Sequence, residues 1–214
     1  MSIELIGSGI SLYVRKIAYI LNHKGLAYEQ EPCFPFNNPE LAAISPLGKI
    51  PVLKDDGFIV NDSSVIAQYL EKKYPENPVI PSDVQDFARV LWFEEYSDSK
   101  VTEILSGLYF QKVAKPKFFG QESDLEIIAE KEAEIPRVFS YLENQLNSDF
   151  IVGDTVSLAD FALYSNFINY FRMNEIVSKT DYPKLAAYLD RLALLDSIQA
   201  VTKSEEAEIA TMAQ

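Results

Sequence analysis

The spacing of apolar residues changes once along this chain, across a proline-bearing stretch near residues 75–83. Before this stretch, short apolar runs alternate with segments of helical period, whereas the long segments after it all follow the helical period. A chain of this kind folds as a small mixed sheet flanked by helices, followed by an all-helical part. We therefore predict two domains, over residues 1–78 and 84–201.

Turn signals divide the first domain into short elements. Gly25 follows a helical period and is a natural helix stop. The sequence Asp55-Asp56-Gly57 lies between two apolar runs and predicts a β-hairpin. The expected strands cover residues 3–6, 28–30, 49–54 and 58–60, and the expected helices cover residues 13–24, 40–43 and 62–74.

The second half of the chain reads as helices without a convincing strand hairpin. The expected helices cover residues 87–108, 125–146, 157–171 and 183–194. Ser157 and Asp160 stand three residues apart at the start of one of them, which is typical of a relative of the capping box. The end of the chain, residues 205–214, lacks apolar anchors, so we expect it to be frayed or loosely docked.

Composition excludes several classes of protein. The single cysteine, Cys33, excludes an internal disulfide and fits a reducing compartment. The single histidine, His23, leaves no zinc site of the usual type and makes a catalytic triad based on histidine improbable. The formal net charge of −13 argues against nucleic acid and anionic membranes as partners, and no apolar run is long enough to cross a bilayer. We expect a cytoplasmic protein with no metal, no nucleic-acid partner and no membrane partner.

Ser11 precedes the first predicted helix and has two interpretations. A serine at this position commonly serves as the N-cap of the helix. Alternatively, its hydroxyl donates a hydrogen bond to a bound thiolate, assisted by the free N–H groups and the positive end of the helix dipole. Serine is too weak an acid to serve as the base, so it would act by stabilising the anion.

Two further features each allow a structural and a functional interpretation. Pro51 at the entry of a strand is either a trans proline opening an edge strand or a cis proline that turns the backbone of Ile50 toward an incoming peptide. Asp62 and Ser63 either cap a helix or form a site for an amino-acid head group. In the second case the carboxylate of that head group meets free N–H groups and its ammonium group meets Asp62.

The order of these features resembles the serine-class glutathione transferases (tau, zeta and several bacterial groups). Four segments in both halves are similar to motifs of that family. Residues 11–16, Ser-Leu-Tyr-Val-Arg-Lys, resemble Ser-Pro-Phe-Val-x-[Arg/Lys]; residues 45–53 resemble NPxGKVPVL; residues 62–66 resemble ESxxI; and residues 153–160 resemble GxxxTxAD. The match covers most of residues 3–195.

The resemblance implies a thioredoxin-like α/β N-terminal domain, an all-α C-terminal domain and a homodimer. It implies binding of glutathione and activation of its thiol as a thiolate that attacks a small hydrophobic electrophile, in conjugation or in a related addition or peroxide reduction. The implied roles are contact with the sulfur for Ser11, backbone pairing for Ile50 beside cis-Pro51, the γ-glutamyl end for Asp62 and Ser63, and the glycyl carboxylate for Lys49.

The chain departs from the family pattern at two of these places. Leu12 stands where proline is usual, and Asp62 stands where glutamate is usual, one methylene longer. Because glutathione is itself an anion, its site must be less negative than the protein as a whole, and Arg15, Lys16 and Lys49 are candidates for that correction.

A second class of function remains open at this stage. The same fold supports non-catalytic interaction proteins, such as regulators of the stringent-starvation type. Retention of Ser11, Ile50, Pro51, Asp62 and Ser63 as a set counts against that alternative. A serine in place of a cysteine at position 11 argues against disulfide exchange, which needs a protein thiolate.

Overall fold

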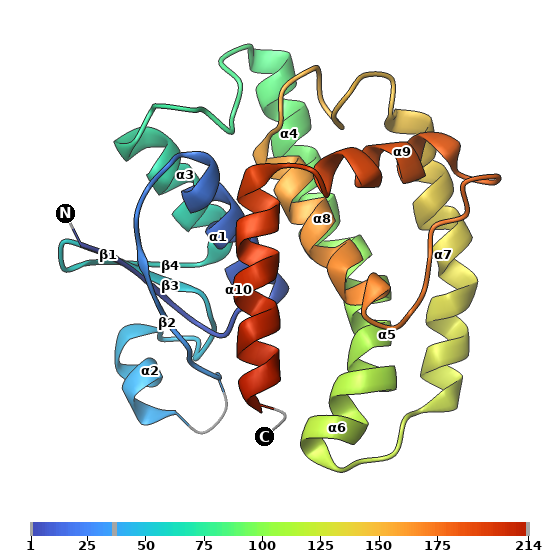
Figure 1. Cartoon of the computed structure of the whole chain (residues 1–214), viewed down its shortest axis with the longest axis horizontal. Coiled ribbons are helices and arrows are strands. Elements are labelled where there is room, and N and C mark those ends of the chain that lie inside the picture. The colour runs from blue at the N-terminus through green and yellow to red at the C-terminus, as the bar shows by residue number, and fades with distance from the viewer. Residues whose placement is uncertain (1, 36–37, 213–214) are drawn as a thin grey trace. The chain divides into compact units, whose positions relative to one another are not determined.

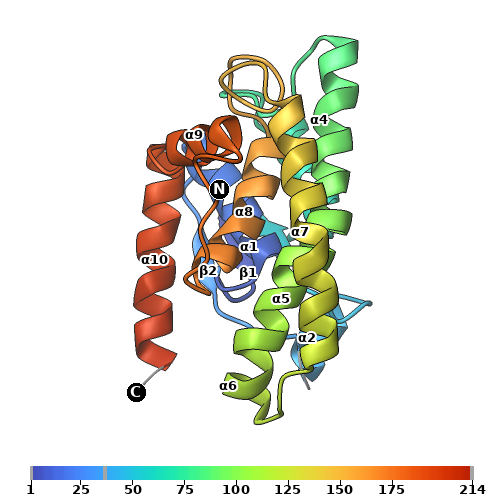
Figure 2. The same cartoon turned by 90° about the vertical axis from the view of Figure 1, so that its right-hand side faces the viewer.

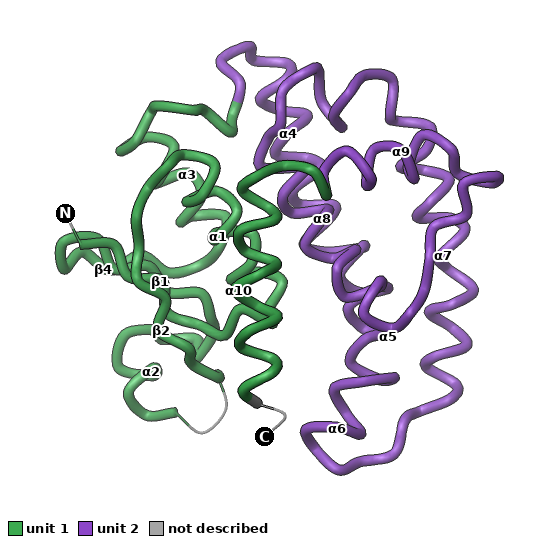
Figure 3. The backbone as a smooth tube through the Cα atoms, in the orientation of Figure 1, with its two compact units in different colours: residues 1–80, 193–214 green, residues 81–192 purple. Residues whose placement is uncertain are grey.

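The computed structural model describes residues 2–35 and 38–212, which form two compact units (Figures 1 and 3). One unit comprises residues 1–80 together with 193–214, and the other comprises residues 81–192. None of the helices in the described part of the chain is both long and apolar enough to span a membrane.

The first unit is built on a four-stranded mixed sheet in the order β2-β1-β3-β4. β1 runs parallel to β2 and antiparallel to β3, and β3 pairs antiparallel with β4. The turn between β3 and β4 holds Asp56 at φ 48° and Gly57 at φ 86°, as a tight hairpin turn requires. The strands are β1 (Ile3–Ile6), β2 (Glu29–Glu31), β3 (Val52–Asp55) and β4 (Phe58–Asn61), which confirms the predicted mixed sheet and hairpin.

Three helices of this unit follow the predicted pattern within a few residues. They are α1 (Leu12–His23), α2 (Pro39–Ile44) and α3 (Ser63–Lys73). Buried Asp55, at the end of β3, accepts hydrogen bonds from the hydroxyls of Tyr69 (3.0 Å) and Tyr74 (2.8 Å). It also pairs with Lys73 at 2.8 Å. Burial opposes ionisation of this carboxyl, but these contacts outweigh the effect of burial and lower the pKa of Asp55. The same contacts hold the C-terminal end of α3 against the sheet.

The second unit is all-helical, as predicted. Its chain runs as one long helix from Val84 to Phe119, turns back along α7 (Figure 2), and continues through α8 and α9. The predicted helix over 87–108 is the middle of that long run, which ends at Gly120 in the left-handed conformation. The elements are α4 (Val84–Tyr96), the π-helical segment η1 (Ser97–Ser106), α5 (Gly107–Tyr109), the π-helical segment η2 (Phe110–Ala114), α6 (Lys115–Phe119), α7 (Leu125–Gln145), α8 (Leu158–Phe171) and α9 (Pro183–Leu192).

The central helix of this unit, α8, begins at the predicted capping pair. Ser157 is the N-cap, and both its N–H and its hydroxyl donate to Oδ2 of Asp160 at 2.7 Å. Oδ1 of the same carboxylate accepts from the N–H of Ile151 (3.0 Å) and from the hydroxyl of Tyr188 (2.8 Å). Asp160 therefore joins the loop before α8 to helix α9, in addition to capping α8.

The expectation for the end of the chain is wrong. Residues 196–212 form helix α10 (Asp196–Met212), which packs against α1 within the first unit. Its first turns bury Ile198 and Val201, and farther along Glu205 is also buried. The part of α10 after residue 204 is anchored by polar contacts of Glu205 and Glu208, in place of the apolar residues that this part of the sequence lacks. Residues 213–214 lie outside the described residues.

This grouping differs from the expected helical domain over 84–201, because the compact helical unit ends at Leu192. The long polar helix α10 follows in sequence but packs with the sheet-bearing unit. Compactness alone does not establish independent folding, so the two-domain division of the sequence stays a prediction.

We expect Asp160→Asn to lower the free energy of unfolding by about 2 kcal/mol, because an amide nitrogen would then face buried donors that now share a carboxylate. Asp154→Asn, at an exposed position in the preceding loop, is the matched control. Denaturant unfolding of both variants measures the difference. Equal midpoints would show that the capping carboxylate adds no stability.

Candidate functional site

Three segments of the first unit leave the sheet at neighbouring positions. Ile6 pairs with Val52 across β1 and β3, and Val52 pairs with Asn61 across β3 and β4. The segment of residues 7–11 follows Ile6, the segment of residues 49–51 precedes Val52, and the segment of residues 62–63 follows Asn61. Strand register therefore gathers all six site residues predicted from the sequence at one end of the sheet.

The first segment is a tight turn between β1 and α1. The N–H of Gly7 donates to the carbonyl of Glu31 and the N–H of Ser8 to that of Cys33, both at 2.9 Å. The N–H of Ser11 then donates back to the carbonyl of Ser8 at 3.0 Å. These bonds fix the turn to the end of β2 and set the start of α1.

Ser11 occupies the N-cap position of α1, with φ −68° and ψ 125°. Its carbonyl accepts the first helical hydrogen bond from the N–H of Arg15. Its half-buried hydroxyl makes no capping hydrogen bond to the helix. The residue thus has the position of a cap without its usual bond, and the first N–H groups of α1 have no partner within the helix by geometry.

The second segment holds Ile50 and Pro51, which are joined by a cis peptide bond. Buried Ser45 closes the preceding turn, because its hydroxyl donates to the carbonyl of Lys49 at 2.8 Å and accepts from the N–H of Lys49 at 3.1 Å. The cis peptide bond excludes the alternative predicted from the sequence, a trans proline that opens an edge strand.

Gly7 allows the first two segments to approach closely. Its φ is +145°, and a Cβ placed there would lie 2.5 Å from Val14 Cγ2 and 3.1 Å from Ile50 Cβ. Any larger residue would push the start of α1 and the Ile50 segment apart. The close approach thus places Ile50 beside the turn that leads to Ser11.

The third segment is the start of α3. Asp62 is its N-cap, with φ 72°, and its Oδ1 accepts from the N–H groups of Ser64 (3.0 Å) and Val65 (3.2 Å). Asp62 is exposed, whereas Ser63 at the first helical position is buried. A positive φ in a residue other than glycine is costly and is found at binding and catalytic sites. The carboxylate and the helix N-terminus therefore lie side by side, with opposite electrostatic character.

The basic residues near these segments differ in what they can reach. Lys49 is exposed, as a contact to a carboxylate requires. Arg15 and Lys16 are fully buried, and Arg15 Nε pairs with Glu205 Oε1 at 2.6 Å. Of the three candidates for reducing the negative charge at the site, only Lys49 is therefore exposed to a ligand, whereas Lys16 is buried and Arg15 is buried and paired with Glu205.

Cys33 lies next to the site but is not prepared for nucleophilic chemistry. It packs against the small core cluster of Ile6, Leu41 and Val52, and the side-chain amide of Asn38 donates to its sulfur at 3.1 Å. Burial, together with the carboxylates of Glu31 and Glu40, raises the pKa of the Cys33 thiol. A raised pKa lowers the thiolate fraction, as expected of an idle thiol.

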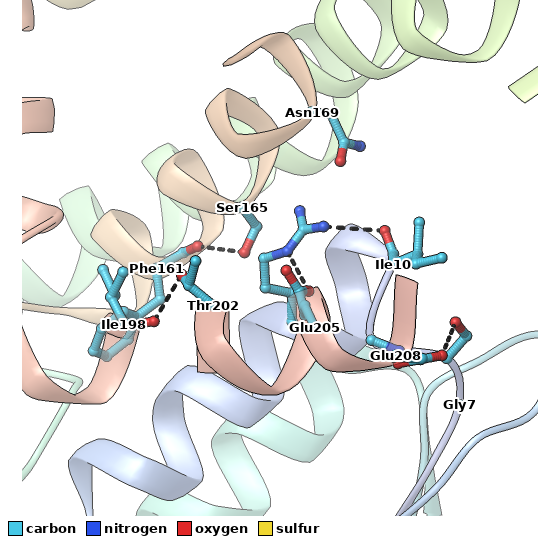
Figure 4. A network of polar contacts seen from close by, with 12 residues as sticks. Gly7, Ile10, Phe161, Ser165, Asn169, Ile198, Thr202, Glu205 and Glu208 are labelled. Carbon is cyan, nitrogen blue, oxygen red and sulfur yellow. Dashed lines mark hydrogen bonds and ion pairs between the residues drawn. The ribbon is translucent and has the colours of Figure 1, made fainter. Parts of the chain in front are cut away.

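Two residues that reach the turn of residues 7–11 carry no functional signal in the sequence. Glu205 and Glu208, both on α10, reach this turn directly or through Arg15 (Figure 4). Nothing in their local sequence distinguishes them from the other acidic residues of α10. Within the described residues, no three histidine, cysteine, aspartate or glutamate side chains gather in a way that suits a metal ion.

Comparison with known proteins agrees with this arrangement. The glutathione S-transferase N-terminal domain family matches residues 5–78, and the C-terminal domain family matches residues 96–205. A wheat (Triticum aestivum) glutathione S-transferase is 30% identical over 199 residues, covering 92% of this chain and 91% of the wheat protein. A zeta-class glutathione S-transferase of Euphorbia esula is 32% identical over 156 residues, covering 69% and 67% of the two chains.

Solved structures show the same fold. A glutathione S-transferase from Methylobacterium radiotolerans, in complex with glutathione sulfonate, superposes with a TM-score of 0.77 at 26% identity, covering 94% of each chain. A thioredoxin-like domain with a mixed four-stranded sheet, joined to a helical domain, is the architecture of the glutathione transferases. The chain belongs to the glutathione S-transferase family and is a glutathione transferase.

Proposed function

We propose that this protein binds glutathione at the sheet end described above and stabilises its thiolate for attack on a small hydrophobic electrophile, in the manner of the serine-type group. The observation that carries the proposal is the Ser11 hydroxyl, which stands at the start of α1 without a capping bond. A hydroxyl not used for capping can donate to a sulfur anion, and the helix dipole supports the same charge.

The energy required is within reach of this arrangement. An unperturbed thiol with a pKa of about 8.5 is only about 3% thiolate at pH 7. Lowering that pKa by about two units takes about 2.7 kcal/mol of preferential stabilisation of the anion. One charge-assisted hydrogen bond contributes about 1.5–3 kcal/mol, and the helix N-terminus adds to it.

The other segments suit the rest of the tripeptide. Asp62 accepts from the N–H groups of Ser64 and Val65, so in the proposal the Ser63 N–H and the positive end of the α3 dipole meet the α-carboxylate of the γ-glutamyl end. The exposed Asp62 carboxylate suits the ammonium group of that end, and Ile50 supplies backbone pairing for the cysteinyl unit. Exposed Lys49 meets the glycyl carboxylate.

In the proposed reaction the thiolate sulfur forms a bond to an electrophilic carbon, and the electron pair leaves with a departing group or is protonated from solvent. Ser11 keeps its proton throughout, because it acts as a donor to the anion. The glutathione thiol loses its proton to solvent on binding.

The binding site is tested by calorimetric titration of glutathione, S-methylglutathione and glutathione disulfide. Asp62→Asn removes the charge while keeping an acceptor for the helix cap and a side chain that tolerates positive φ. We expect glutathione affinity to fall about tenfold or more, as for loss of a charge-assisted contact. Asp154→Asn, the same change at an exposed position of the other unit, should bind like the wild type.

Heat with none of the three ligands, at protein concentrations able to detect millimolar affinity, would contradict the proposal. That outcome would favour the alternative, a non-catalytic interaction protein of the stringent-starvation type on the same fold.

The role of Ser11 is tested by Ser11→Ala. We expect the variant to keep glutathione binding, while the pH profile of kcat/KM with a chloronitroarene moves upward by about one to two pH units, because the thiolate loses its hydroxyl donor. The sign follows from the anion: losing a donor to the charged form raises the pKa of an acid. An unchanged profile would show that Ser11 is only a structural residue.

We also propose a homodimer. Phe58 and Ile59 on β4 and Val65 on α3 leave apolar side chains exposed on the sheet-bearing unit, which supports association through that surface. Light scattering at micromolar concentration should give about twice the chain mass of 24.2 kDa. A single species of the chain mass would refute the dimer.

A further inference from the structure

The last helix of the chain is bound to the turn that leads to Ser11. On α10, Glu208 accepts from the Ser8 hydroxyl through Oε1 at 2.6 Å and from the Gly9 N–H through Oε2 at 2.9 Å (Figure 4). Both oxygens of one carboxylate are thus used on two consecutive residues of the turn. Hydrogen bonds to an ionised acceptor are the strong ones.

A second carboxylate of the same helix acts through Arg15. Glu205, one turn before Glu208, accepts from Arg15 Nε at 2.6 Å, while Arg15 Nη2 donates to the carbonyl of Ile10 at 3.1 Å. Arg15 is fully buried and Glu205 is 2% exposed. The arginine therefore connects α10 to Ile10 of the turn.

A side chain at Gly9 would displace the Glu208 carboxylate from its present position. A Cβ at this position would lie 2.8 Å from Glu208 Oε2 and 3.2 Å from Glu205 Cγ. Gly9 is not among the glycines of the described residues that have a positive φ, so its backbone conformation does not require a glycine. Its small size instead leaves room for the side chains of α10. The turn and α10 are fitted to each other.

We infer that Glu208, with Glu205 acting through Arg15, is a positioning residue for the Ser11 hydroxyl. The inference rests on the proposed function. The N–H of Ser11 is bonded to the carbonyl of Ser8 at 3.0 Å, so a displacement of Ser8 or Gly9 passes directly to Ser11 and to the first N–H groups of α1. Glu208 contacts the turn; in this inference it does not contact glutathione.

Positioning and simple electrostatics predict opposite signs. Removal of a negative charge near a thiolate would by itself lower the pKa of the thiol. Loss of positioning would misplace the Ser11 donor and raise that pKa, because geometry controls how much a donor stabilises an anion. The direction of the pKa change therefore identifies the mechanism.

The test compares Glu208→Gln with Glu206→Gln, the same change at an exposed position of α10. For Glu208→Gln we expect kcat/KM with a chloronitroarene to fall about tenfold and its pH profile to move upward. Glu206→Gln should match the wild type in both. An unchanged or a downward-shifted profile in Glu208→Gln would overturn the positioning role.

Amide hydrogen exchange at Gly9 supplies a readout that needs no substrate. We expect the Gly9 N–H to exchange about tenfold faster or more in Glu208→Gln than in the wild type, with exchange in the core strand β1 unchanged. Equal Gly9 exchange in the two proteins would overturn the inference. A wild type that binds no glutathione while Glu208→Gln still speeds exchange would refute the proposed function and leave the contact of α10 with the turn established.

Discussion

The register of three strands determines where the candidate site lies. Ile6, Val52 and Asn61 are paired across the sheet, and each is followed or preceded by one of the segments that the proposed glutathione site uses. Because a shift of one residue turns every side chain of a strand to the opposite face, the buried face of the sheet fixes this register strongly. The fold thereby brings together residues that are about fifty positions apart in the chain.

Much of this arrangement could be predicted from local patterns. The apolar run at residues 3–6, the Asp-Gly turn after Asp55 and the helical period of α1 each determine one element through short-range physics. The capping pair of Ser157 and Asp160 is equally local, and the structure confirms it. The motif order predicted the family because a glycine, a proline and a cap are each required by backbone geometry at particular points of the fold.

The contribution of α10 could not be predicted in this way. Its contacts with Ser8, Gly9 and Arg15 join residues 190 to 200 positions apart in the chain and are polar, so they leave no period or apolar run in the sequence. Glu205 and Glu208 look like solvated surface residues of a helix, since glutamate is rarely buried unless it is paired. Their partners, Arg15 for the buried Glu205 and the turn of residues 8–9 for the partly exposed Glu208, also lack any signal that points to the end of the chain. A single sequence does not show which side chains pair over such long distances along the chain.

The charges around the turn also bear on how a protein with a net charge of −13 accommodates an anion. Two carboxylates lie close to the start of α1, yet neither is free. Glu205 is paired with the buried guanidinium of Arg15, and each oxygen of Glu208 accepts one hydrogen bond, from the Ser8 hydroxyl and from the Gly9 N–H. Hydrogen-bond donors directed at a carboxylate reduce the field that it projects, so these groups can hold the turn in place with less repulsion toward a bound thiolate. The turn thus obtains charge-assisted bonds on the side facing α10, while the Ser11 hydroxyl, which makes no capping bond, stands at the positive end of the α1 dipole.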